Sequence, residues 1–133
     1  MTDFPITSRV PRLGVPRHVF EHQLTAALTT GTAKWEWIVP FNCKILDVIC
    51  DSETAGQTGG TSDIIDVNRN GTTIYTTQGN RPTLVLADTG MFTEAGEPEV
   101  TGLIAGDILS YDVDQICTTG SARFKIVIVV GPA

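Results

Sequence analysis

Short runs of alternating hydrophobic and polar residues, separated by glycine, proline and small polar residues, make up most of this 133-residue chain. A period of two is typical of a strand with one buried face, whereas an amphipathic helix would repeat every three to four residues. No helical repeat of useful length is present, although residues 24–28 fit one helical turn as well as they fit a strand. The alternation predicts strands over residues 20–28, 34–39, 44–51, 82–87, 107–114 and 123–130.

The clearest single element is a hairpin whose tip is Asn70-Gly71. A two-residue type I′ turn needs positive φ at both central positions, and asparagine and glycine tolerate it best. The implied register pairs Arg69 with Thr72, Asn68 with Thr73, Val67 with Ile74 and Asp66 with Tyr75. Val67 and Ile74 then share one face, so the turn and the hydrophobic pattern agree on the same register.

About eight short strands with turn signals every 8–12 residues predict an all-β fold, an antiparallel two-sheet β-sandwich of jelly-roll type. Residues 126–130 are apolar on both faces, as in a strand that is covered on both sides. We expect an extended, Pro-rich N-terminal arm over residues 1–18 and a sandwich domain over residues 19–133. The predicted inward-facing residues are Trp37, Leu46, Val48, Val67, Ile74, Leu84, Leu109, Tyr111, Val113 and Ile128.

Three cysteines, Cys43, Cys50 and Cys117, occur without CxxC spacing. An odd number and this spacing indicate neither a disulfide framework nor a zinc site, so we interpret them as small buried hydrophobic residues. Cys43 and Cys50 are an odd number of residues apart, which on one continuous strand predicts that they face opposite sides.

The charge is unevenly distributed along the chain. Residues 1–17 hold three arginines against one aspartate, and the remaining chain holds six basic residues against fourteen acidic ones. An acidic body repels phosphate, so we expect no nucleic-acid partner for the folded part. No stretch has the apolar length of a membrane span, and the first residues lack the features of a signal peptide. These patterns predict a protein that is made in the cytoplasm and has no membrane partner.

Two motifs resemble metal sites. His18-Val19-Phe20-Glu21-His22 fits the H-x-x-E-H pattern of some zinc proteases, but that chemistry requires a helix, and Pro16 and a Thr-rich run favour a strand here. Asp66-x-Asn68-x-Asn70-Gly71 matches the start of a calcium loop, but its twelfth position is Thr77 instead of a bidentate glutamate. We therefore predict no metal site.

Candidate acid–base chemistry is limited to Asp107, Asp112 and Asp114. Asp112 and Asp114 share a strand face, but no histidine accompanies them, and we interpret all three as part of a solvated outer face whose like charges discourage edge pairing. Nucleophile-elbow, P-loop and dinucleotide motifs are absent from the sequence. We expect a protein that is not an enzyme and that needs no cofactor.

Four segments, in this order, carry a resemblance to a known group: Trp37–Pro40, Asp66–Tyr75, Asn80–Leu84 and Gly106–Gln115. Over about residues 35–130 the chain resembles small β-sandwich modules in virion proteins of tailed bacteriophages. The resemblance implies a non-enzymatic virion protein, made in the host cytoplasm. The module occurs in head decoration proteins, head fibres and tail or baseplate components. Residues 1–20 lie outside the segments that are similar.

A single sandwich with a short arm fits a capsid decoration, or cement, protein best. We expect a homotrimer that binds the major capsid protein or another virion protein and stabilises the shell. One alternative is a tail, baseplate or fibre component. A second is a carbohydrate-binding sandwich that would use Trp35, Trp37 or Tyr75 as stacking platforms, although all three alternate with polar residues as core-facing aromatics do.

The arm is the predicted attachment device. Its prolines reduce the entropy that is lost on docking, its apolar residues can anchor it, and its arginines can form forked hydrogen bonds to carboxylates. The alternative is that the arm folds back on its own sheet. The predicted partner-binding residues are Phe4, Ile6, Arg9, Val10, Arg12, Leu13, Val15 and Arg17.

Overall fold

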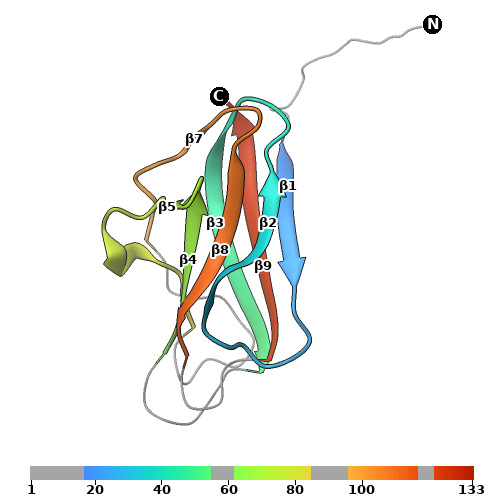
Figure 1. Cartoon of the computed structure of the whole chain (residues 1–133), viewed down its shortest axis with the longest axis vertical. Coiled ribbons are helices and arrows are strands. Elements are labelled where there is room, and N and C mark those ends of the chain that lie inside the picture. The colour runs from blue at the N-terminus through green and yellow to red at the C-terminus, as the bar shows by residue number, and fades with distance from the viewer. Residues whose placement is uncertain (1–16, 55–61, 85–95, 117–121) are drawn as a thin grey trace, which may run out of the picture.

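The protein is an antiparallel two-sheet β-sandwich, which confirms the predicted fold class (Figure 1). The computed structural model describes residues 17–54, 62–84, 96–116 and 122–133. Within these ranges there is no α-helix, and residues 24–28 form neither a helical turn nor strand. The elements are β1 (His18–Gln23), β2 (Gly31–Ile38), β3 (Cys43–Thr54), β4 (Asp63–Arg69), β5 (Thr72–Thr73), a 3-10 turn η1 (Gln78–Asn80), β6 (Thr83–Leu84), β7 (Gly102–Leu103), β8 (Ile108–Gln115) and β9 (Ala122–Pro132).

The two sheets are named here after their central strands. The β9 sheet has the order β1-β9-β3-β7, and the β8 sheet has the order β2-β8-β4-β5, with β6 also paired to β4. The chain changes sheet at every step from β1 to β4 and again from β7 to β9. This alternation, with antiparallel neighbours throughout, is the connectivity of a jelly roll.

The hairpin has the predicted turn, and the two residue pairs next to the turn have the predicted register. Asn70 has φ of 50° and Gly71 has φ of 83°, so both central residues are in the left-handed region, as a type I′ turn requires. Asn68 pairs with Thr73, and Arg69 pairs with Thr72. The local signal was sufficient here because turn chemistry and strand polarity select the same pairing.

The core lies between the sheets and includes eight of the ten residues predicted to face inward. Tyr111, Phe124 and Ile128 are fully buried at its centre, with contributions from both sheets. Trp37 is only partly buried at the side of the core. The buried members of the predicted set are Val48, Val67, Ile74, Leu84, Leu109, Tyr111, Val113 and Ile128.

The prediction for Leu46 was wrong, because β3 contains a bulge. Ile45 pairs with Val130 and Asp47 pairs with the next residue, Val129, so Leu46 is an extra residue without a partner and is 37% exposed. An extra residue reverses the inside–outside alternation beyond it. Cys43 and Cys50 therefore both face the core, instead of opposite sides as predicted, and are 1% and 0% exposed.

Asp107 connects the hairpin tip to the turn before β8 through hydrogen bonds. Its side chain is buried, whereas the sequence predicted a solvated position for it. Its Oδ2 accepts hydrogen bonds from Arg69 Nε at 2.7 Å and from the Ile104 backbone N–H at 2.9 Å. Its Oδ1 accepts one from Asn70 Nδ2 at 3.0 Å. These donors, led by the Ile104 amide and then Asn70, lower the pKa of Asp107 to about 2.

We expect Asp107→Asn to lower the melting temperature at neutral pH and to flatten its acid dependence. A carboxyl whose folded pKa is depressed stabilises the fold above its unfolded pKa of about 4, and that contribution is lost as the pH falls towards about 2. Thermal unfolding between pH 7 and pH 2 measures this, with the exposed Glu36→Gln as the matched carboxylate-to-amide control. Equal slopes for wild type and Asp107→Asn would contradict the assignment.

Candidate functional site

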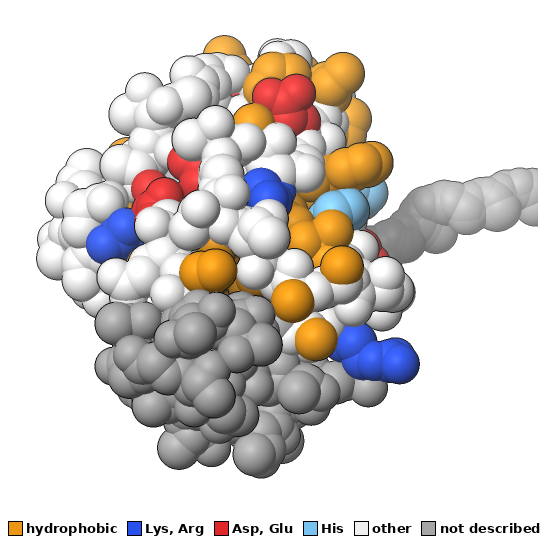
Figure 2. All heavy atoms as spheres, turned by 60° about the horizontal axis from the view of Figure 1, so that its bottom comes forward, with side chains coloured by type: hydrophobic (Ala, Val, Ile, Leu, Met, Phe, Trp, Pro, Cys, Tyr) orange, Lys and Arg blue, Asp and Glu red, His pale blue; other side chains and the backbone are white. Residues whose placement is uncertain are grey.

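The candidate site lies where β1 and β2 end their sheets on the same side of the molecule (Figure 1). Each of these strands has a single strand neighbour within the described residues. Figure 2 shows hydrophobic side chains gathered around a histidine on this side, and both histidines of the chain belong to β1. We call this surface the aromatic edge; its residues are His18, Phe20, His22, Trp35, Trp37, Phe41 and Tyr111.

The alternation of β1 and β2 places these rings towards the gap between the two sheets. His22 stacks on Trp35, with ring centroids 4.3 Å apart and an interplanar angle of 9°. His22 Nδ1 is 2.9 Å from the hydroxyl of Tyr111 on β8, and Trp37 Nε1 donates to the backbone oxygen of Glu21 on β1 at 3.2 Å. The Trp37 indole thus joins the two edge strands, and His22 joins β1 to β8 of the opposite sheet.

The aromatic edge is partly open to solvent. Trp35 is 47% exposed and Phe41 is 44% exposed. Phe20 and Tyr111 are buried behind the two histidines. His18 contacts both Phe20 and Phe41, and His22 contacts both Tyr111 and Trp35. An exposed apolar cluster on a buried aromatic base is typical of an interaction surface.

Two of the rings at this edge, those of His22 and Tyr111, favour their neutral forms. Burial lowers the pKa of His22, so its imidazole tends to be uncharged at neutral pH. Burial, with a smaller effect from Cys50, raises the pKa of Tyr111 to about 12 and keeps its hydroxyl protonated. The contact between His22 and Tyr111 therefore favours uncharged groups, which lowers the cost of removing this part of the edge from water.

A hollow of about 320 Å³ lies at one end of the aromatic edge, where β1 begins. It is lined by Arg17, His18, Phe41, Asn42, Val130, Gly131 and Pro132. Arg17 is the only predicted partner-binding residue within the described part of the chain, and it is exposed at the rim of this hollow. Phe4, Ile6, Arg9, Val10, Arg12, Leu13 and Val15 lie outside the described residues.

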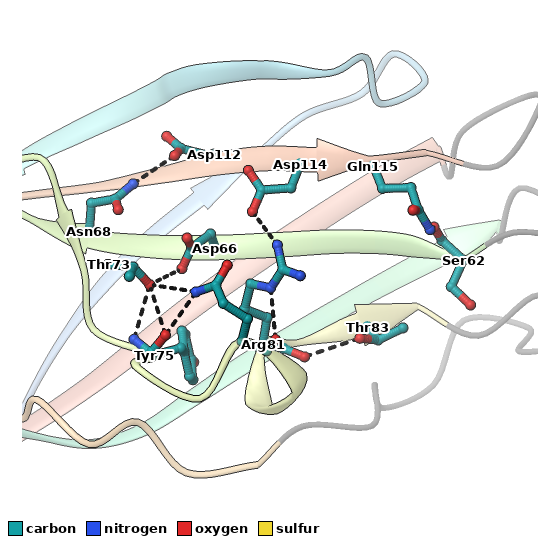
Figure 3. Close-up of polar contacts among 11 residues, drawn as sticks. Ser62, Asp66, Asn68, Thr73, Tyr75, Arg81, Thr83, Asp112, Asp114 and Gln115 are labelled. Carbon is teal, nitrogen blue, oxygen red and sulfur yellow. Dashed lines mark hydrogen bonds and ion pairs between the residues drawn. The ribbon is translucent and has the colours of Figure 1, made fainter.

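A separate cluster, made of polar side chains, lies on the outer face of the β8 sheet (Figure 3). Asp66, Asp112 and Asp114 have carboxylate oxygens within 4.8 Å of one another, the only such group of possible metal ligands within the described ranges. Asp66 is directly opposite Asp112 in the sheet, and burial is the main cause that raises the pKa of Asp66. The pairing concentrates negative charge, which is unfavourable unless donors compensate it.

Protein donors already hold each of these carboxylates. Thr73 Oγ1 donates to Asp66 Oδ1 at 2.6 Å, and Arg81 donates to Asp114 Oδ2 at 2.6 Å (Figure 3). Asp112 accepts from Asn68 Nδ2 and from the Ala33 backbone N–H, both at 2.8 Å. The cluster is therefore a hydrogen-bonded network that joins β2, β4, β5 and β8.

The two metal-like motifs lie on strands. His18 and His22 share the inner face of β1 and make ring contacts, whereas Glu21 lies on the opposite face, so the helical arrangement of a zinc protease is not formed. Asn68 and Asn70 of the calcium-like motif bond to Asp112 and Asp107 instead of converging on one point. The residues of both motifs therefore make contacts within the β-sandwich.

No family model, curated protein or solved structure matches this chain. Among the described residues, no helix is long and apolar enough to cross a membrane.

The sequence indicated the arm as the partner-binding site but did not indicate the aromatic edge. Trp35 alternates with polar residues as a core-facing aromatic does, and it lies on the same side of β2 as Trp37, but it is 47% exposed at the edge of its sheet. The high density of aromatic residues and histidines in residues 18–41 was the available signal.

Proposed function

We propose that this protein is a non-enzymatic virion structural protein of a tailed bacteriophage, a capsid decoration protein that binds the head surface. The observation that carries the proposal is the position of Arg17, the described member of the predicted partner-binding set, which lines an apolar hollow that continues into the aromatic edge. A partner could bind the arm and this edge together.

The proposed contact combines two kinds of interaction. The exposed rings of Trp35 and Phe41 supply the apolar area that dominates binding energy at interfaces. The arginines of the arm supply donors for carboxylates on the partner. A bridging protein of this type would stabilise a shell by adding buried area where capsid subunits meet.

The virion assignment rests on the resemblance of Trp37–Pro40, Asp66–Tyr75, Asn80–Leu84 and Gly106–Gln115 to phage sandwich modules. These segments correspond to the end of β2, the hairpin, the connection into β6, and β8 with the turn before it. The resemblance therefore falls mainly on strands of the β8 sheet and the turns next to them. A tail, baseplate or fibre location would use the same sandwich.

Carbohydrate binding is a second candidate function, and the exposure of Trp35 favours it. A half-exposed indole supported from behind by His22 is a suitable stacking platform for a sugar ring. Tyr75 is 1% exposed and Trp37 is only partly exposed, so Trp35 alone would serve. Binding on a glycan array that is lost in Trp35→Ala would support this candidate.

The decoration proposal is tested by cryo-electron microscopy of phage particles with and without this protein. We expect additional protrusions on the head when it is present. A chain lacking residues 1–17 should remain folded and lose particle binding, and Trp35→Ala should weaken binding by about tenfold or more, because buried tryptophans are frequent interface hot spots.

The matched control is Thr72→Ala, on the exposed hairpin strand β5 at the far end of the β8 sheet. Its binding should equal that of wild type, and all variants should melt cooperatively. Density on the tail alone would support the alternative location. Unchanged head binding by the truncated chain would show that the arm is not the attachment device.

A further inference from the structure

The outer face of the β9 sheet carries an apolar stripe that nothing within the described residues covers. Val127 and Val129 of β9 form its centre and are partly exposed, and Ile49 of β3 lies beside them. Val19 of β1 is 43% exposed, and Leu46, displaced outward by the bulge in β3, is 37% exposed. We call Val19, Leu46, Ile49, Val127 and Val129 the valine face.

The strand registers place the members of the valine face on a diagonal across the three strands. Val129 pairs with Val19 on β1 and with Asp47 on β3, and Val127 pairs with Ile49 on β3 and with Glu21 on β1, so each valine has one apolar and one acidic lateral neighbour. Leu46 extends over Gly131, where its Cδ1 lies 2.8 Å from the position that a Cβ would occupy. The sequence predicted that β9 is covered on both sides, and the second cover is missing from the described part of the chain.

The charges around the valine face favour a second copy of the same chain as its partner. The chain has an excess of six acidic residues and only three lysines, and two of these, Lys44 and Lys125, lie on this outer face. Asp47, Asp51 and Glu21 lie there too. A surface with both signs can pair with itself, whereas an acidic surface repels its copy.

The order of these charges fits a two-fold axis. Lys44 is level with Gly131, and Asp51 is level with Lys125, and both positions are three residues from Ile128 along β9. A two-fold axis that crosses the strands at Ile128 exchanges the two levels. It places Lys44 opposite Asp51 of the second copy, and Val127 opposite the second Val129.

The size of the surface fits a contact of moderate strength. Eleven residues of β9 extend about 36 Å, and three strands are about 14 Å wide, which gives a footprint on the order of 500 Å² on each copy. This is at the small end of stable interfaces, for which micromolar dissociation constants are common.

We propose that the valine face binds a second copy of this chain in a two-fold, face-to-face packing of the two β9 sheets. Sheets that pack in this way stay within about 30° of alignment and interdigitate their side chains. The contact leaves the aromatic edge available, so the proposal goes beyond the proposed function and does not depend on it. The proposed two-fold dimer replaces the homotrimer expected from the sequence.

Sedimentation equilibrium of the full chain over about 1–100 µM tests the proposal. We expect a mass of two chains at the higher concentrations and about a tenfold weaker association, or none, in Val129→Glu. Lys44→Glu and Asp51→Lys should each weaken the association about tenfold, and the double variant should recover most of it, because the exchanged charges again face each other. Lys34→Glu, the same charge change on β2, should have little effect.

A wild-type mass of one chain or of three chains over this range would overturn the proposal. Failure of the double variant to recover association, when its circular dichroism matches that of wild type, would overturn the two-fold geometry. A monomer that associates only after deletion of residues 1–16 would show that the arm covers this face, and would overturn the proposal as well.

Discussion

Replacing Phe124 with alanine is expected to destabilise the protein by about 3–5 kcal/mol, the usual cost of deleting a buried phenylalanine side chain. Phe124 lies on β9 and is fully buried, and its ring centroid is 5.7 Å from that of Tyr111 on β8. It therefore links the two sheets at the centre of the core. A single domain is typically stable by about 5–15 kcal/mol, so the variant would be close to unfolding.

Urea denaturation followed by tryptophan fluorescence measures this effect. The midpoint should fall while the dependence on urea stays the same, since the surface exposed on unfolding hardly changes. The control is Phe41→Ala, because Phe41 is 44% exposed and its removal leaves no cavity. A loss of less than about 1 kcal/mol for Phe124→Ala would contradict its central position.

Cys43 and Cys50 are expected to resist thiol reagents until the whole sandwich unfolds. Both are almost completely inaccessible, and burial raises the pKa of each thiol, which disfavours the reactive thiolate. In a Cys117→Ser variant, we expect labelling at pH 8 to be slower by about a thousandfold or more than in concentrated urea, because it requires opening of a core strand.

This measurement also tests the bulge in β3. If β3 were regular between Cys43 and Cys50, an odd separation would turn one of the two thiols to the outer face, and one thiol per chain would react rapidly. The bulge at Leu46 turns both inward, so neither should react. Rapid labelling of one thiol in the folded variant would contradict the register of β3 with β9.

The elements that were predicted correctly depend on neighbouring residues alone. Asn70-Gly71 forms the expected turn because positive φ is a property of the residues at the turn. Leu109, Tyr111 and Val113 face the core because a regular strand alternates. Periodicity and turn chemistry were therefore sufficient for the fold class and for most of the core.

The errors and omissions concern positions where distant segments meet. Leu46 faces outward because β9 imposes a pairing that β3 satisfies only with an extra residue, and residues 44–51 do not reveal this. β7 is two residues long and exists through its pairing with β3, so no local pattern indicated it.

The candidate sites divide in the same way, into features that neighbouring residues specify and features that arise where distant segments meet. The sequence indicated a basic, apolar arm and the hydrophobic character of β9 on both faces. The aromatic edge arises only because β1 and β2, from different sheets, both end their sheets on one side, where His22 stacks on Trp35. Alternation specifies which way a side chain points from its own strand, but its burial depends on whether another strand lies beyond it, and that is set by the order of strands in the assembled sheets.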